Sequence, residues 1–149
     1  MAEPAEPAPS LLDHLDIQDL DGQRWNRDTV DGRVVLLDFW ATWCAPCLAQ
    51  MPHLAKLHDR FGDRGFILLG INLDGDSRNA LRSWLRRQNL PWPQIHGPRG
   101  LEGPLAQDFG VEALPRTLLF DTEGRLVARD LSAEALDAAV EALVPRTSR

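Results

Sequence analysis

The only two cysteines of the chain, Cys44 and Cys47, lie three positions apart. A mostly apolar run at residues 34–40 precedes them, and residues 46–61 show the apolar spacing of a helix. A C-x-x-C pair between a strand and a helix is typical of a thiol–disulfide active site. Free N–H groups and the dipole at a helix start favour a thiolate, so Cys44 is the expected nucleophile. Cys47, one turn further on, is placed to resolve the mixed disulfide.

Two other interpretations of the pair have less support. A structural disulfide that encloses only two residues would constrain little of the unfolded chain. A closed zinc site needs four ligands, but the chain has no second C-x-x-C and its four histidines are scattered. The sequence therefore favours redox chemistry by the cysteines themselves, with neither a metal nor a cofactor.

The segment from Asp38 to Cys47 resembles the active-site segment of thioredoxin, with Ala45 where thioredoxin has glycine. The Trp-Ala-Thr-Trp-Cys sequence at residues 40–44, and Met51-Pro52 after it, are most similar to the TlpA/ResA (redoxin) branch of bacterial thiol–disulfide oxidoreductases. The resemblance implies a thioredoxin fold and an enzyme that exchanges thiols and disulfides.

Asp38 interrupts the apolar strand that leads to the cysteines. A buried carboxyl group tends to keep its proton near neutral pH. In thioredoxin the residue at this position relays a proton for the second cysteine, and the resemblance implies that role for Asp38 toward Cys47. Many TlpA-like proteins carry asparagine at this position. The alternative to a buried proton relay is an Asp38 that faces solvent at the strand end.

Pro115 precedes a second apolar strand, and the resemblance implies that the Leu114–Pro115 bond is cis and lies beside the cysteines. In the family this arrangement exposes backbone that pairs with a substrate segment. Considered alone, Pro115 fits an ordinary trans proline at a strand start. Arg116 stands where the family usually has threonine, and a cation there would stabilise the Cys44 thiolate or attract acidic substrates. The residues expected to contact substrate are Trp43, Ala45, Pro46, Leu114, Pro115 and Arg116.

Turn signals and apolar periodicity predict an α/β fold with a mixed central β-sheet covered by helices on both faces. Residues 73–114 hold more chain than thioredoxin has there, which resembles the helical insertion of the TlpA/ResA branch before the cis-proline. We expect a Pro/Ala/Glu-rich disordered tail at 1–10, a thioredoxin-like domain at 11–144 and a flexible tail at 145–149. The predicted elements are an N-terminal β-hairpin at 15–25, strands at 33–40, 66–72, 94–96, 116–120 and 125–129, helices at 46–61, 78–88 and 101–109, and a last helix capped by Ser132.

Several polar side chains outside the cysteine segment have weaker signals. His53 and His58 fit solvated helix positions, and one of Asp74 and Asp76 is expected to face the active site, as acidic residues near there do in TlpA-like proteins. A basic stripe on the 78–88 helix fits a solvated face. Its members are Arg78, Arg82 and Arg86.

Composition limits the partners. The net charge of −6 argues against nucleic acid, and no apolar run approaches the ~20 residues that cross a membrane. The expected partners are a disulfide-containing protein substrate and an upstream thiol electron donor, with the chain a monomer. The N-terminus lacks the pattern of a signal peptide, and the Pro/Ala/Glu tract is typical of a spacer. We therefore expect a trimmed mature domain outside the cytoplasm, with a cytoplasmic protein as the alternative.

The expected activity is reduction of protein disulfides, although the direction of catalysis is left open by Ala45-Pro46. One alternative is a peroxidase of the peroxiredoxin (AhpC/TSA-like) type, which shares the fold. Phe39 and Thr42 do not give the Pro-x-x-x-Thr/Ser-x-x-Cys pattern of that type. Further alternatives are a copper-handling module and a binding module without turnover.

Overall fold

The computed structural model describes residues 10–146, so residues 1–9 of the tail predicted at 1–10 and residues 147–149 of the tail predicted at 145–149 lie outside it. The central sheet has five strands in the order β5-β4-β3-β6-β7. The parallel set is β3 (Val34–Trp40), β4 (Phe66–Asn72) and β5 (Gln94–His96). β6 (Arg116–Phe120) runs antiparallel to β3, and β7 (Leu126–Arg129) runs antiparallel to β6. The sheet is therefore mixed, as predicted.

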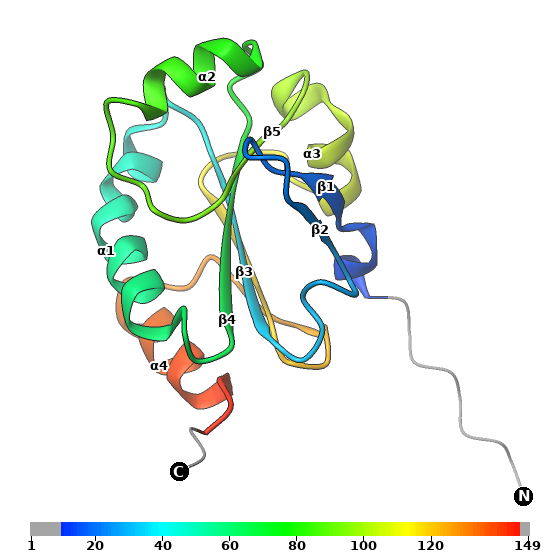
Figure 1. Ribbon diagram of the computed structural model, residues 1–149, viewed down its shortest axis with the longest axis vertical. Coiled ribbons are helices and arrows are strands. Elements are labelled where there is room, and N and C mark those ends of the chain that lie inside the picture. Colours follow the sequence, from blue (N-terminus) through cyan, green and yellow to red (C-terminus); the bar gives the residue numbers. More distant parts are fainter. Residues whose placement is uncertain (1–9, 147–149) are drawn as a thin grey trace, which may run out of the picture.

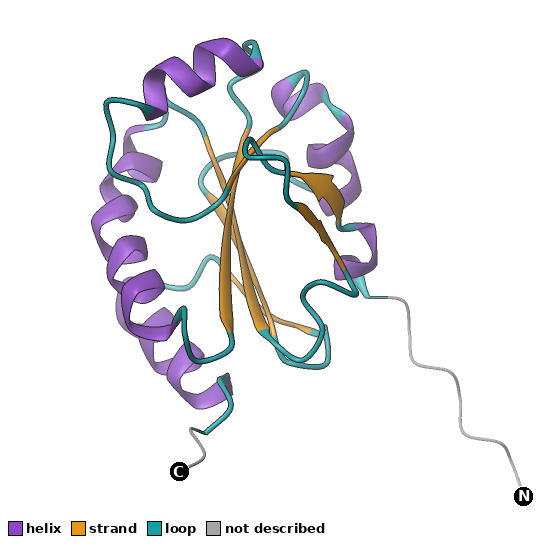
Figure 2. Cartoon of the chain, viewed as in Figure 1, coloured by secondary structure: helices purple, strands orange, loops and turns teal. Residues whose placement is uncertain are grey.

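Helices cover both faces of this sheet (Figures 1 and 2). α1 (Ala45–Phe61) and α4 (Ala133–Leu143) lie on one side, and α3 (Pro104–Phe109) lies on the other with a two-stranded hairpin. The hairpin is formed by β1 (Asp16–Gln18) and β2 (Arg24–Asn26). The remaining helices are η1 (Leu11–His14), α2 (Arg78–Leu85) and η2 (Gly100–Glu102).

Strand β3 carries the core on both of its faces. All seven of its residues are buried, which explains its nearly continuous apolar sequence. Because successive side chains point to opposite faces, Leu36 and Trp40 join the core under α1, while Leu37 and Phe39 pack on the side of α3. Both cysteines belong to the first of these cores.

Two helix predictions differ from the structure. The α-helix predicted for 78–88 ends at Leu85. From there to Gln88, the predicted end, the chain forms hydrogen-bonded turns instead of α-helix. The helix predicted for 101–109 is divided at Gly103 into η2 and α3. Pro104 starts α3 at a position where the missing N–H costs nothing. An added Cβ on Gly103 would lie 1.8 Å from the carbonyl oxygen of Pro98. The backbone at Gly103 passes so close to Pro98 that only glycine fits at this position.

Ser10, the last residue of the predicted N-terminal tail, is held by hydrogen bonds in the structure. Ser10 is the N-cap of η1, and its hydroxyl accepts from the N–H of Leu12. The same hydroxyl donates to the carbonyl of Gly124 in the β6–β7 turn. Among residues 10–146, no helix has the length and apolar character needed to cross a membrane.

Candidate active site

Cys44 and Cys47 lie where β3 gives way to α1. Cys44 is the N-cap of α1, and its Sγ accepts from the backbone N–H of Cys47 at 3.2 Å. The two residues are joined by a disulfide, with a Cα–Cα distance of 5.3 Å. The first turn of α1 holds no Asp or Glu, so no acidic side chain within that turn opposes a thiolate at the N-cap. Pro46 lies in this first turn, as its missing N–H allows.

The surface around the disulfide is apolar and exposed. Trp43 is 62% exposed, and Ala45 and Pro46 are exposed as well. Cys44 and Cys47 themselves are only 4% and 1% exposed. Trp40, by contrast, is fully buried, as the sequence predicted. An exposed tryptophan next to a sheltered disulfide is suited to contact an apolar partner segment.

Asp74 holds the loop that joins β3 to α1. Its carboxylate accepts from the backbone N–H of Thr42 at 2.7 Å and from the Thr42 hydroxyl at 3.0 Å. The N–H of Asp74 in turn donates to the side chain of Asn72. The acidic residue predicted near the active site is therefore Asp74, and it acts on the backbone just before Trp43.

We expect Asp74→Ala to lower the free energy of unfolding by about 1–2 kcal/mol, because two hydrogen bonds to a carboxylate are lost. Urea unfolding would measure this loss. Asp76→Ala is the matched control, since within residues 10–146 the Asp76 side chain makes no hydrogen bond. Equal effects of the two substitutions would contradict the bracing role of Asp74.

Asp38 lies in the middle of the sheet, on the face that packs under α1. It is 1% exposed, and neither carboxyl oxygen has a hydrogen-bond partner within residues 10–146. Burial raises its pKa from 3.8 to about 7. The expected burial is confirmed, and the alternative of a solvent-facing Asp38 is wrong. Near neutral pH this carboxyl group can therefore both hold and release a proton.

The Leu114–Pro115 peptide bond is cis. Pro115 directly precedes β6, whose first residue, Arg116, pairs with Phe39 near the end of β3. The chain leaves β3 at Trp40 and reaches Cys44 four residues later. The cis bond and the disulfide therefore share one end of the sheet. Both Leu114 and Pro115 are partly exposed there.

Arg116 makes an ion pair that the sequence did not indicate. Its Nε lies 3.5 Å from a carboxylate oxygen of Asp130. Because Arg116 pairs with Phe39 rather than Asp38, its side chain leaves the sheet on the face opposite the core that holds the cysteines. This placement does not support a cation beside Cys44.

Two polar residues interact more than the sequence suggested. Nε2 of His53 lies 2.8 Å from a carboxylate oxygen of Asp137, which links α1 to α4. Arg82 donates to the carbonyl of Leu20, so it joins α2 to the hairpin. The prediction of solvated side chains at these two positions was wrong. Both partners are distant in sequence, and helical periodicity carries no signal for them.

Comparison with known proteins supports the interpretation of this site. The AhpC/TSA family profile matches residues 5–129. The thiol–disulfide oxidoreductase ResA of Bacillus thuringiensis is 27% identical over 111 residues, which cover 74% of this chain and 62% of the relative. ResA of Bacillus subtilis is also 27% identical, covering 74% of this chain and 60% of its own length. The chain thus spans about three fifths of the length of these curated relatives.

Solved structures give the same result. A thiol–disulfide oxidoreductase from Bacteroides fragilis is 30% identical with a TM-score of 0.76, covering 87% of this chain and 96% of its own. The thioredoxin domain of a thiol–disulfide oxidoreductase from Bacteroides vulgatus is 26% identical with a TM-score of 0.75, covering 87% and 92%. The fold and site define a thioredoxin-fold protein with a C-x-x-C centre. The chain belongs to the AhpC/TSA family, among its TlpA/ResA-like thiol–disulfide oxidoreductases.

Proposed function

We propose that this chain reduces disulfides of protein substrates through a dithiol–disulfide cycle of Cys44 and Cys47. The observation that carries the proposal is the position of Cys44. Its sulfur lies at the start of α1, accepts the N–H of Cys47 and is surrounded by exposed apolar residues. A helix start lowers a thiol pKa, and the thiolate is the form that attacks a disulfide.

The cycle conserves atoms and electrons. The Cys44 thiolate attacks one sulfur of the substrate disulfide, and the other sulfur leaves as a thiolate. The Cys47 thiolate then attacks the Cys44 sulfur, which closes the Cys44–Cys47 disulfide and releases the substrate as a dithiol. The substrate gains two electrons, and an upstream thiol donor returns two electrons to the chain.

Asp38 is the proposed proton acceptor for the Cys47 thiol. It lies on the sheet face that packs against α1, in the same core as Cys47. With a pKa of about 7, its carboxylate form is available to take the thiol proton near neutral pH. Deprotonation of Cys47 supplies the thiolate that resolves the mixed disulfide.

The proposed substrate surface consists of the exposed apolar residues and the loop before β6. An extended substrate segment would pair with the backbone of Leu114, as in strand addition, while Trp43 contacts its side chains. Arg116 is not part of the proposed substrate surface, because it pairs with Asp130 on the other face of the sheet. The surface comprises Trp43, Ala45, Pro46, Leu114 and Pro115.

The reduction potential of the pair tests the direction of electron flow. The protein would be equilibrated with dithiol buffers while the fluorescence of Trp40 and Trp43 reports the redox state. A potential near roughly −270 mV, as in thioredoxin, is expected for a reductant. A potential near roughly −120 mV, as in DsbA, would make the chain an oxidant and contradict the proposed direction.

A peroxidase activity is the second candidate, because the matched family profile is that of AhpC/TSA. Consumption of hydrogen peroxide with a dithiol donor separates the two functions. We expect no peroxide consumption above that of the donor alone. The copper-handling alternative is tested by titration with Cu(I). The chain with His53 and His96 in place is compared with variants that lack one of these histidines.

We propose that the chain works as a monomer outside the cytoplasm, where protein disulfides persist. The Pro/Ala/Glu composition of residues 1–10, which is typical of a spacer, supports this location. Cell fractionation of the natural protein tests the compartment, and light scattering tests the oligomeric state. Recovery in the cytoplasmic fraction, or the mass of a dimer, would contradict the respective part.

A further inference from the structure

A row of paired residues crosses the sheet at Asp38. Asp38 pairs with Thr117 on one side and with Gly70 on the other, and Gly70 pairs with Gln94 of β5. Side chains of laterally paired residues point to the same face of a sheet. Gln94 and Asp38 therefore share a face, separated only by a residue without a side chain.

The amide of Gln94 fills the space above Gly70. A Cβ added to Gly70 would lie 2.3 Å from Oε1 and 2.8 Å from Nε2 of Gln94. The Gln94 side chain thus extends across the neighbouring strand in the direction of Asp38. Since adjacent strands lie ~4.8 Å apart, the amide is about one strand spacing from the backbone of Asp38.

Trp40 fixes the orientation of this amide. The indole Nε1 of Trp40 donates to Oε1 of Gln94 at 3.0 Å, so the acceptor end of the amide is occupied. The Nε2 group is left as a donor, and it is buried without a partner among the described residues. Nε1 of Trp92 is a second buried donor of this kind. Among residues 10–146, these two donors, Nδ2 of Asn72 on the same face of the sheet, and the two acceptor oxygens of Asp38 are all buried without a partner.

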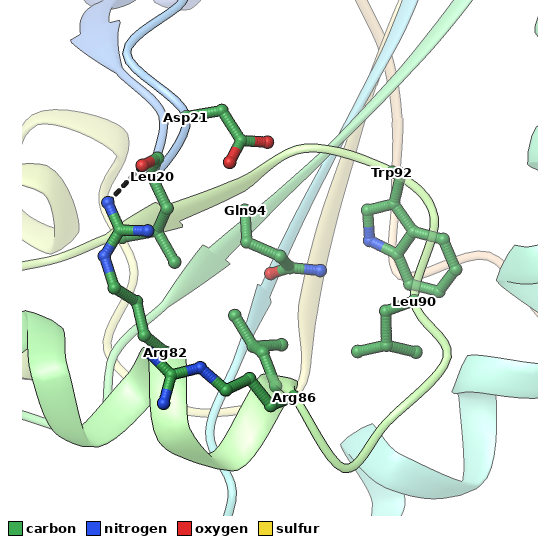
Figure 3. A pocket seen from close by; sticks show the side chains of 8 residues that line it. Leu20, Asp21, Arg82, Arg86, Leu90, Trp92 and Gln94 are labelled. Atoms are coloured by element: carbon green, nitrogen blue, oxygen red, sulfur yellow. Dashed lines mark hydrogen bonds between the residues drawn. The ribbon is translucent and has the colours of Figure 1, made fainter.

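A pocket of about 270 Å³ opens to the surface beside two of the residues that carry these donors (Figure 3). Gln94 and Trp92 both line it, and in Figure 3 the indole nitrogen of Trp92 lies on the side of the ring that is turned toward Gln94. A water needs room and two to four polar partners: the pocket offers the room beside Gln94 and Trp92, and their two donors and the Asp38 oxygens are the unpaired partners next to it. The rest of the lining is Leu20, Asp21, Arg82, Leu85, Arg86 and Leu90.

We propose that Gln94 is a positioning residue for Asp38: with Trp92, it holds the water through which the Asp38 carboxyl group exchanges its proton with solvent in this pocket. The inference rests on the proposed function, in which Asp38 accepts a proton from Cys47. Water held by Gln94 and Trp92 donates to the ionised carboxylate of Asp38. This hydrogen bond lowers the pKa of Asp38 below the value that burial alone would give.

Other titratable groups near this face must be distinguished from Asp38. α1 contributes the two cysteines, His53 and His58, of which His58 lies beside Trp92 with ring centroids 6.3 Å apart. α4 contributes Asp137, which pairs with His53. Asp21, Arg82 and Arg86 line the outer pocket. Because the oxidised protein has no titrating thiol, the measurement is best made on that form.

The test follows the carboxyl ¹³C resonance of Asp38 by NMR during a pH titration of the oxidised protein. In Gln94→Met the donor is lost, and we expect the pKa of Asp38 to rise by about one pH unit, a tenfold change in proton affinity. Gln94→Glu is the second variant. It keeps an acceptor for Trp40 Nε1, and in its ionised form it has no donor and adds a negative charge, so it is also expected to raise the Asp38 pKa.

Ile95→Val is the matched control, because Ile95 is the next residue of β5 and is buried on the opposite face. It should leave the pKa of Asp38 unchanged. The inference is overturned if both Gln94 variants titrate Asp38 as Ile95→Val does. The measurement needs no turnover, so failure of the proposed reductase activity would appear separately, in the activity assay of the unmodified protein.

Discussion

Replacing Cys44 with serine is expected to lower the dithiol-driven reduction of a protein disulfide by roughly 10³-fold or more, because the attacking thiolate is lost. Cys47→Ser should be equally inactive in turnover for a different reason. Its Cys44 still attacks, but no second thiol resolves the product, so a mixed disulfide accumulates. Reduction rates and mass spectrometry of the protein after mixing with substrate measure the two effects.

Ala49→Ser is the matched control for these serine variants. It adds the same hydroxyl group to an exposed position of the same helix, outside the proposed substrate surface, and leaves both thiols in place. We expect it to keep the activity of the unmodified protein within a small factor. The proposed assignment would be reversed if Cys44→Ser trapped substrate while Cys47→Ser did not.

The order of strands and helices was predictable because each element carries its own local signal. The apolar run of β3 and the paired turn residues of the β6–β7 hairpin are examples. The cysteines were predictable for the same reason, since a C-x-x-C pair is local. Asp38 was predicted to be buried because a single carboxylate interrupts that apolar run.

What could not be predicted depends on partners distant in sequence. Nothing near Arg116 indicates its pairing with Asp130, and nothing near His53 indicates Asp137. The placement of Gln94 above Gly70 follows from the register of three strands. Single-residue patterns do not specify register across a parallel sheet, because its strands are joined by long crossovers.

Asp38→Asn is expected to stabilise the protein at neutral pH and to have little of this effect in acid. The folded pKa of Asp38 is about 7, whereas its unfolded value is 3.8. Between these values the unfolded chain ionises and the folded chain does not, so the wild type loses stability as pH rises from about 4 to 7. Asparagine has no such ionisation. The difference in unfolding free energy between variant and wild type should therefore grow by about 4 kcal/mol across this range and stay level above it.

Urea unfolding of the oxidised proteins at a series of pH values measures this difference without interference from thiols. Asp121→Asn is a control with the opposite sign. Although partial burial raises the pKa of Asp121, the N–H groups of Arg125 and Glu123 and the Arg125 side chain outweigh it, and the pKa is lowered. Asp121 therefore stabilises the fold above the unfolded pKa and loses this contribution as pH falls, so Asp121→Asn costs stability at neutral pH.

A constant difference between Asp38→Asn and wild type from pH 4 to 8 would show that Asp38 ionises normally in the folded protein. It would then be unsuited to accept a proton from Cys47 near neutral pH.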